Sequence, residues 1–363
     1  MHFTIGKSAL LAELGLLAGI ADKKSTIPVL GNLLIEALGD ALTLKATDLD
    51  VSLSTRVNAE VEQPGAFCLS AKKLFDIVRR LPDAEVAIKA DGDYAKLTCG
   101  GSRFKLLSLP KDNFPEIKSH DGTFIAVPSA TLRAMIARTI FAITAEESRY
   151  SLNGAKLEIG DGRLRMVATD GHRLSFVEAE SGPLDAAIDA LIPKKALVEL
   201  AKLTAETETV EMALSDNHAY FRFGPREMSS RLLTGQFPNY DLVLPKENHN
   251  RVTVEAAQLA AAVRRVALMA DERSHSIKME LGDGQIALSA VSSEAGEAQE
   301  TLSADYAGPQ IVAGFNAQYV LDALSVIEGD AVIAFKDGNA QVEFRAKEES
   351  GMLNRLIVMP MRV

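Results

Sequence analysis

The chain has 363 residues, which is too long for one ordinary hydrophobic core and predicts two or three domains. Its composition, 47% hydrophobic and 24% charged, is typical of a globular protein in water, and no apolar run is long enough to cross a membrane. The net charge of −10 by itself argues against DNA binding, because simple DNA-binding domains are usually basic. The first residues, Met1 to Ile5, have a strand pattern without the layout of a secretion signal, so we expect a cytoplasmic protein.

Hairpin turns predict that one unit of about 120 residues occurs three times. A Gly-Asp pair joins two segments of alternating apolar residues at 38–40, 159–161 and 281–283. A second series of polar turns follows at matching positions, at Asp91-Gly92, Asp216-Asn217 and Asp337-Gly338. Glycine, aspartate and asparagine are the residues that tight hairpin turns prefer, so both series predict β-hairpins.

Two helices are predicted in each unit from apolar residues spaced three and four apart. The six predicted helices span 7–20, 71–81, 129–142, 193–203, 255–269 and 316–326. Each unit therefore consists of two half-units, each with a strand, a helix and several further strands. Polar, turn-rich segments separate the units and place the domains at 1–120, 121–248 and 249–363.

Each domain is expected to be a sheet layer covered by two helices, which is an α+β fold. Three such domains in a row leave an open sheet edge at either end of the chain, and an open edge invites pairing with another chain. Head-to-tail pairing either polymerises or closes into a ring, and closure of a curved chain with one partner is the more economical solution.

The charges are distributed unevenly along the chain. Basic residues outnumber acidic ones in the six predicted helices, whereas the strands and loops are strongly acidic. Adjacent basic pairs occur at Arg79-Arg80, Lys194-Lys195 and Arg264-Arg265. In the absence of a zinc finger or helix-turn-helix pattern, such pairs favour sequence-independent contact with phosphates. Solvated helix faces are the alternative explanation, and the helix at 316–326 carries no basic residue.

Four segments spread over the chain are specific enough to suggest a family. They are Ala168-Thr169-Asp170-Gly171-His172-Arg173-Leu174, Tyr150-Ser151-Leu152-Asn153-Gly154, Gly314-Phe315-Asn316-Ala317-Gln318-Tyr319-Val320-Leu321 and Val358-Met359-Pro360-Met361-Arg362-Val363. Together with the three repeats, they resemble the bacterial DNA polymerase III beta subunit, the sliding clamp, over the full length. The resemblance implies a processivity factor that closes as a homodimer around duplex DNA, with the helices lining the hole and with no covalent chemistry of its own.

The resemblance also implies a peptide-binding pocket between the second and third domains. It would receive short motifs of the DNA polymerase III alpha subunit, the clamp loader delta subunit and repair proteins. Its expected residues are Leu152, Thr169, Gly171, His172, Arg173, Leu174, Pro238, Val243, Asn316, Tyr319, Val358, Met359, Pro360 and Met361. Apolar side chains in this set suit aliphatic and aromatic anchors, polar groups suit the orientation of a peptide, and methionines suit several partners.

DNA contacts and a dimer interface are implied in the same way. The expected DNA-binding residues are Lys24, Arg79, Arg80, Arg149, Tyr150, Lys194 and Lys195. The dimer should join the first domain of one chain to the third domain of the other. On the first domain the candidates are Lys72, Lys73, Ile77, Arg103, Phe104, Lys105 and Leu106, and on the third they are Leu268, Met269, Glu294, Glu297 and Glu300.

Two other functions remain as alternatives. An enzyme could use Asp170 and His172, but no nucleophile elbow, HExxH or phosphate loop accompanies them, so no catalytic residue is predicted. A protein-binding adaptor without DNA affinity would fit the acidic net charge, although the basic helices oppose it.

Cys68 and Cys99 lie in strand-like segments and are expected to be buried free thiols, with no metal or cofactor.

Overall fold

The computed structural model describes residues 1–21, 26–146, 148–182, 187–215, 217–294, 296–349 and 351–362. These residues form two compact structural units, called unit 1 and unit 2, which differ from the three repeats predicted above. They are described separately below. Unit 1 comprises Met1–Arg133 and Lys195–Leu232, and unit 2 comprises Ala134–Lys194 and Leu233–Val363. Over the described ranges, none of the helices combines the length and the apolar character that a membrane span needs.

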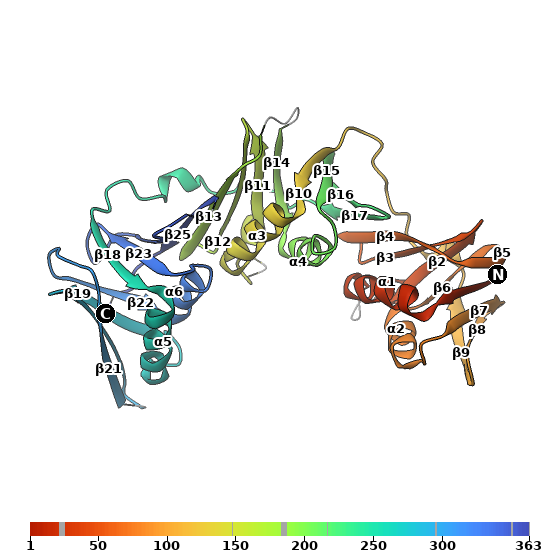
Figure 1. Ribbon diagram of the computed structural model, residues 1–363, viewed down its shortest axis with the longest axis horizontal. Helices are drawn as coiled ribbons and strands as arrows, with labels where there is room; N and C mark the ends of the chain where they lie inside the picture. The colour runs from red at the N-terminus through yellow and green to blue at the C-terminus, as the bar shows by residue number, and fades with distance from the viewer. Residues whose placement is uncertain are drawn as a thin grey trace. The chain divides into compact units, whose positions relative to one another are not determined.

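The helices lie close to their predicted positions (Figure 1). The described ranges contain α1 (Lys7–Ile20), α2 (Ala71–Arg80), α3 (Ser129–Thr139), α4 (Lys194–Leu203), α5 (Ala256–Val266) and α6 (Ala317–Leu324). Each of them begins at the residue after a strand ends, so the chain repeats a strand–helix step six times. The half-units predicted from the apolar spacing are therefore present.

Four predicted helices run past the end of the α-helix; α6 ends at Leu324 instead of 326, and the other three end as follows. α2 ends at Arg80 because Leu81 precedes Pro82, and a residue before proline disfavours helical dihedrals. α3 ends at Thr139, whose hydroxyl donates to the Met135 carbonyl at 2.8 Å, and the chain continues as the 3-10 helix η3 (Ile140–Ala142). α5 continues in the same way as η6 (Ala267–Met269).

Unit 1 contains one continuous antiparallel sheet. Its strands are β1 (His2–Gly6), β2 (Asn32–Leu38), β3 (Ala41–Thr47), β4 (Val51–Asn58), β5 (Glu60–Gln63), β6 (Gly65–Ser70), β7 (Glu85–Asp91), β8 (Tyr94–Cys99), β9 (Ser102–Leu109), β10 (Ile125–Pro128), β15 (Thr209–Ser215), β16 (His218–Phe223) and β17 (Arg226–Arg231). They follow the order β10-β15-β16-β17-β4-β3-β2-β6-β9-β8-β7-β1-β5. The β4–β17 pair is the step that joins strands of the first predicted domain to strands of the second.

Unit 2 contains two antiparallel sheets. Their strands are β11 (Gly154–Gly160), β12 (Arg163–Thr169), β13 (Arg173–Glu180), β14 (Ile188–Pro193), β18 (Asn250–Glu255), β19 (Ser276–Gly282), β20 (Gln285–Ser292), β21 (Gly296–Ser303), β22 (Ile311–Asn316), β23 (Asp330–Phe335), β24 (Val342–Ala346) and β25 (Met352–Val358). The orders are β14-β11-β12-β13-β25-β24-β23-β18 and β21-β20-β19-β22. Here β13 pairs with β25, just as β4 pairs with β17 in unit 1.

The predicted hairpins at the Gly-Asp pairs are present, with two kinds of turn. The turn between β2 and β3 has Gly39 at φ +64°. In the second and third repeats the two turn residues lie one position later, as Asp161-Gly162 and Asp283-Gly284, and all four have positive φ. Positive φ at both turn positions matches the twist of the strands, and aspartate and glycine tolerate it. Of the second series, Asp216 lies outside the described residues.

Alternating side chains separate the buried and the exposed face of each sheet. In unit 1, Leu10, Leu14 and Leu17 of α1 are buried against the inner face, as their spacing predicts. Strand β3 buries Leu44 on that face and directs Lys45 to the other. Figure 1 shows α1, α2 and α4 on the same side of this sheet.

Cys68 and Cys99 are buried free thiols, and burial raises the pKa of Cys68 to about 11.

Among the edges left unpaired in the described sheets, those of β9 and β21 carry residues of the predicted dimer interface. β21 is the edge strand of its sheet and pairs with β20 alone. In β9, the residues Ser102–Leu107 pair only with β8, because the pairing with β6 is confined to Ser108 and Leu109. An exposed edge of this kind offers a row of backbone donors and acceptors to another strand.

Candidate functional site

The Asp170 turn between β12 and β13 is held by its own side chains. Thr169 Oγ1 donates to the Arg173 carbonyl at 2.6 Å and accepts from Gly171 N at 3.1 Å. Asp170 Oδ1 accepts from His172 N at 2.9 Å and from Arg173 N at 3.0 Å. Gly171 adopts φ +89°, which glycine reaches without steric cost. The turn is therefore a rigid frame that presents the side chains of His172 and Arg173.

Arg173 is the centre of a polar network. Its guanidinium pairs with Asp170 at 3.1 Å, pairs with Asp322 of α6 and donates to the Phe141 carbonyl at 2.5 Å. It also lies over the Tyr319 ring at 4.5 Å. Its side chain is only 12% exposed, so these interactions are poorly screened by water. Arg173 therefore ties the turn to α6.

The start of α6 supplies the next part of the site. The Asn316 side chain accepts from Gln318 N at 2.9 Å and from Tyr319 N at 3.4 Å, which is an N-cap. The Tyr319 ring stacks on His172, with centroids 6.4 Å apart and planes at 19°. Burial, helped by the charge of Asp170, raises the pKa of Tyr319, so the phenol stays neutral near pH 7.

The C-terminal segment closes the site between two strands. Val358 pairs with Arg173 in the β13–β25 ladder. Beyond the strand, Met359 N donates to the His172 carbonyl at 2.9 Å, and Met361 N donates to the Gly314 carbonyl at 2.8 Å. The Met359 side chain is 40% exposed. This segment therefore bridges the Asp170 turn and β22, with a methionine facing solvent.

An apolar cluster forms the floor beside the turn. It contains Val167, Leu174, Phe176, Tyr240 and Ile357, and Val243 packs against it. The Tyr240 hydroxyl donates to Glu158 at 2.5 Å, and burial raises the pKa of this tyrosine. Burial opposes ionisation of Glu158, but hydrogen bonds from Lys156 and Tyr240 outweigh it and lower the pKa of Glu158.

The residues predicted for the pocket all lie in unit 2. Thr169, Gly171, His172, Arg173, Leu174, Asn316, Tyr319, Val358, Met359 and Met361 are linked by the contacts above, and Pro360 lies between the two bridging methionines. Val243 joins the floor. Leu152 belongs to the 3-10 turn η4 (Tyr150–Leu152) next to Arg149, whose guanidinium donates to the Asp170 carbonyl at 2.9 Å. Pro238 is exposed beside Phe237, which packs on the floor.

Sequence reasoning missed the residues that hold Arg173. Asp322 and the Phe141 carbonyl are far from the turn along the chain, and neither belongs to a recognisable motif. Asp322 is the single acidic residue of the predicted helix at 316–326, which was the only signal available.

Comparisons with known proteins decide the family. Models of the DNA polymerase III beta subunit match residues 1–118 with the N-terminal domain, 126–239 with the central domain and 241–362 with the C-terminal domain. The chain belongs to the DNA polymerase III beta subunit family. It is thus a DNA sliding clamp of three α+β domains and not an enzyme, and the resemblance seen in the sequence motifs is confirmed.

Relatives from several bacteria match the whole chain. The beta sliding clamps of Pseudomonas putida and Caulobacter vibrioides are 36% and 37% identical, and each match covers 100% of both chains. A crystal structure of the Pseudomonas aeruginosa beta subunit matches with a TM-score of 0.94 at 34% identity. A sliding clamp from Bartonella birtlesii bound to griselimycin matches with a TM-score of 0.95 at 32% identity, and both structures are covered completely.

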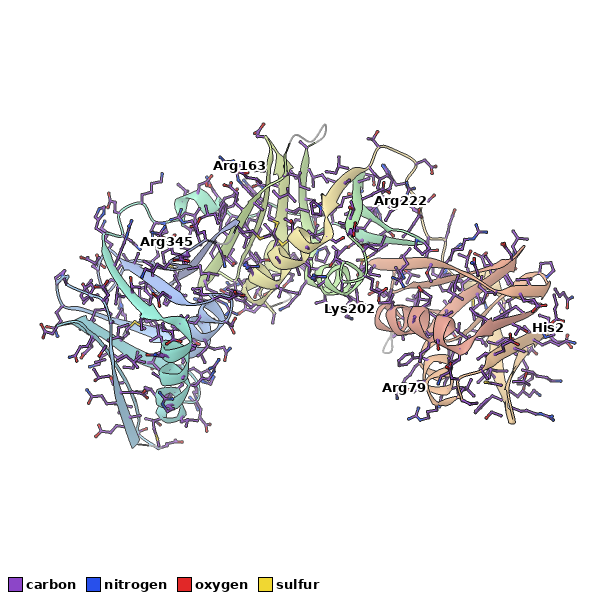
Figure 2. All side chains as sticks on the ribbon, in the orientation of Figure 1. His2, Arg79, Arg163, Lys202, Arg222 and Arg345 are labelled. Atoms are coloured by element: carbon purple, nitrogen blue, oxygen red, sulfur yellow. The ribbon has the colours of Figure 1, made fainter. Side chains whose placement is uncertain are left out.

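In this sliding clamp several predicted DNA-binding residues have partners within the chain. Arg79 and Arg80, in the last turn of α2, both pair with Asp76. Lys195, on the first turn of α4, pairs with Asp48. Figure 2 shows Arg79 and Lys202 on the helix side of the unit 1 sheet and Arg222 on its other side. The basic helices therefore share one face of this unit.

The remaining DNA-binding predictions lie at other places. Arg149 pairs with Glu146 at 2.9 Å and also supports the Asp170 turn. Tyr150 is 71% exposed, and Lys194 is half-buried at the start of α4. Lys24 lies outside the described residues. An exposed ring and nearby cations suit contact with a polyanion.

The predicted dimer residues lie on β9 and β21, on α2 and η6, and in the turn before β21. Arg103, Phe104, Lys105 and Leu106 belong to β9, and Lys72, Lys73 and Ile77 belong to α2 of the same unit. Leu268 and Met269 belong to η6, Glu297 and Glu300 to β21, and Glu294 to the turn before β21. Leu268 is 78% exposed. Glu300 pairs with Arg265 in its own chain, so its carboxylate is already partly neutralised.

Proposed function

We propose that this sliding clamp closes as a head-to-tail homodimer around duplex DNA and holds its partners by short peptides at the site built around Arg173. The observation that carries the peptide site is the C-terminal segment, which is hydrogen-bonded both to His172 and to Gly314. Backbone hydrogen bonds join the strands and the terminal segment of this site, so a peptide would not have to order them.

The peptide would meet two kinds of surface. Val243 and Met359 offer apolar contact to aliphatic or aromatic anchors next to the core cluster that contains the buried Leu174, and methionine adapts to different shapes. His172 and Tyr319 offer rings that are partly accessible, and Asn316 caps the helix below them. This combination supports binding of the polymerase alpha subunit, the clamp loader delta subunit and other partners that carry a clamp-binding motif.

DNA would be held without sequence readout. The basic residues of α2 and α4, together with Arg149 and Tyr150, would approach phosphates, while the acidic remainder of the chain would repel DNA elsewhere. A closed ring needs little affinity for DNA, because escape from a circle requires opening of the ring.

We further propose that the clamp works in the cytoplasm, where chromosomal DNA is replicated, and that its domains end near residues 120 and 248.

The peptide site can be tested by removing the C-terminal segment. Deletion of Met359–Val363 removes both bridging hydrogen bonds and one apolar wall, so we expect binding of a labelled clamp-binding peptide to disappear. Fluorescence anisotropy measures the affinity, and sedimentation velocity shows whether the dimer survives. A control variant, Leu38→Ala, removes an exposed side chain in unit 1 and should bind the peptide normally. Retained affinity in the deletion would refute the site.

Encirclement can be tested on nicked circular DNA. After loading by a cognate clamp loader, the clamp should co-elute with the circle in gel filtration and be lost once the circle is cut. Changing Arg79, Arg80, Lys194 and Lys195 together to alanine should impair loading or sliding and leave peptide affinity intact, because these residues lie outside the peptide site. Equal binding to circular and linear DNA would show ordinary electrostatic attachment.

A further inference from the structure

Unit 1 contains a second copy of the frame that builds the Arg173 site. At the turn between β3 and β4, Thr47 Oγ1 bonds the Val51 carbonyl at 3.2 Å and accepts from Leu49 N at 3.0 Å. Asp48 Oδ1 accepts from Asp50 N at 3.0 Å and from Val51 N at 2.7 Å. These are the bonds that Thr169 and Asp170 make one repeat later. The next strand is tied in the same way, because Arg231 N donates to the Asp50 carbonyl at 2.7 Å.

In both units an arginine also holds the linker that joins one repeat to the next. Arg222 of β16 pairs with Glu227 and donates to the His120 carbonyl at 3.0 Å. In unit 2, Arg355 pairs with Glu343 and donates to the Pro245 carbonyl at 3.0 Å. In both places an arginine on the outer face of the sheet holds the linker between two repeats.

The space under the two linkers is filled differently. In unit 2 the floor is apolar, with Val167, Leu174, Phe176 and Ile357 packed together. The matching positions in unit 1 are Lys45, Ser52, Ser54 and Ser229, as the pairing of Ser52 with Ser229 and of Leu174 with Ile357 shows. Serine and lysine do not fill the volume of phenylalanine and leucine. A cavity of about 310 Å³ remains under the unit 1 linker, lined by Lys45, Ser54 and Ser229 among others.

One wall of this cavity is aromatic. The rings of His120 and Tyr220 stack with centroids 5.0 Å apart and planes at 20°, and Phe124 meets His120 edge-on at 5.5 Å. Gly122 gives this histidine its room, since a Cβ there would lie 2.4 Å from His120 Nε2. Arg222 lies over the Phe124 ring at 3.9 Å.

The other walls are largely polar and include three cations. Lys45, Lys118 and Arg222 line the cavity against a single carboxylate, Glu227. Arg222 pairs with Glu227 at 2.9 Å and Lys45 pairs with Glu36 at 2.8 Å, whereas Lys118 has no ion-pair partner among the described residues. Burial lowers the pKa of the neighbouring His218, and the charges of Lys118 and Arg231 lower it further, which agrees with a positive local field.

We propose that this cavity binds a small organic anion in which a planar ring carries a phosphate or carboxylate group. The anionic group would accept charge-assisted hydrogen bonds from Lys118 and Lys45 and further bonds from the serine hydroxyls. The ring would lie along the His120 and Phe124 wall. The volume is at the lower end of the range of about 300–1,000 Å³ for ligand sites, which suits a ligand of this size. The proposal does not depend on the peptide site or on encirclement of DNA.

Phenyl phosphate is the probe that tests both halves of the ligand. It is titrated into the full-length clamp, labelled with ²H and ¹⁵N, and amide chemical shifts are followed by NMR. We expect saturable shifts that cluster at the linker residues Ser119 and His120 and at Arg222. Inorganic phosphate, which lacks the ring, and phenol, which lacks the charge, should each bind at least roughly tenfold more weakly. Benzoate distinguishes a site for phosphate from one that also accepts a carboxylate.

Two variants locate the binding. Ser54→Phe introduces the residue found at the matching position of unit 2 and should fill the cavity, which would abolish saturable binding. Lys118→Met removes an exposed cation and should weaken binding roughly tenfold, whereas the matched control Lys96→Met, an exposed lysine on β8, should leave it unchanged. Absence of saturable shifts in the unaltered clamp would overturn the proposal. Equal affinity of phenyl phosphate and inorganic phosphate, or binding that survives Ser54→Phe, would overturn it as well.

Discussion

Arg173 concentrates the interactions of the proposed peptide site in one side chain. It neutralises Asp170 and Asp322, bonds the Phe141 carbonyl and covers the Tyr319 ring. A planar guanidinium reaches all of these groups at once, and an ammonium does not. The residue therefore holds together the turn that presents His172 and the helix that presents Tyr319.

We expect Arg173→Ala to destabilise the protein by about 3 kcal/mol, because two poorly exposed carboxylates lose their partner. Urea unfolding measures this loss, and peptide affinity measured by anisotropy should fall in the same variant. Arg173→Lys should recover part of the stability but little of the affinity. The control is Arg163→Ala, a half-exposed arginine of β12 paired with Glu178, for which a change of about 0.5 kcal/mol or less is expected. Normal peptide affinity in Arg173→Ala would contradict the role given to this residue.

At the scale of elements, a buried ion pair fastens α1 to β17 in unit 1. Two guanidinium nitrogens of Arg226 donate to the Glu13 carboxylate at 2.7 and 2.9 Å, and Thr55 donates to it at 2.7 Å. Glu206 accepts a further bond from Arg226 at 2.5 Å. Burial alone would raise the pKa of Glu13, but the bonds from Arg226 and Thr55 lower it below its ordinary value.

This pair predicts how stability depends on pH. In the unfolded chain Glu13 titrates near pH 4.3, and in the folded chain it titrates lower, so its contribution is complete above about pH 4.3 and is lost as the pH falls through the folded value. We expect Glu13→Gln to be less stable than the parent at pH 7 by about 3 kcal/mol. As the pH is lowered from 5, the variant should lose less stability than the parent. Urea unfolding across this range measures both. The control is Glu60→Gln, an exposed carboxylate of β5; parallel pH profiles for all three proteins would count against the assignment.

At the scale of the whole molecule, the open edges of β9 and β21 are where we propose that a second copy of the chain pairs. Leu268 lies beside β21 on η6 and is 78% exposed, so its side chain is available for contact with a partner. Phe104 and Leu107 of β9 are exposed on the other edge. Pairing of these two edges would bury apolar surface and satisfy backbone groups together.

We expect Leu268→Asp to weaken the dimer by at least roughly tenfold, because a charge would enter the proposed interface. Sedimentation equilibrium measures the dissociation constant. Leu242→Asp provides a matched control, since Leu242 is 80% exposed but lies on η5 beside the peptide site. An unchanged dissociation constant for Leu268→Asp would place the interface elsewhere.

The sequence by itself determined the three repeats, the six helices and the hairpins, because these depend on local physics. Apolar spacing selects a helix or a strand, and residues such as Asp161 and Gly162 tolerate the positive φ of a tight turn. It also predicted His172, Arg173 and Tyr319 as site residues, although only through the family motifs. Helix ends were less accurate, since Thr139 and Pro82 act through neighbours that periodicity does not weigh.

Only the tertiary structure decided which distant residues meet. The pairing of β13 with β25 places Val358 beside Arg173, and Asp322 reaches the same guanidinium from α6. The cavity under the unit 1 linker is decided in the same way, because Ser54 and Ser229 become neighbours only when β4 pairs with β17. Contacts of this kind depend on how whole strands and helices pack, and no short stretch of sequence contains that information.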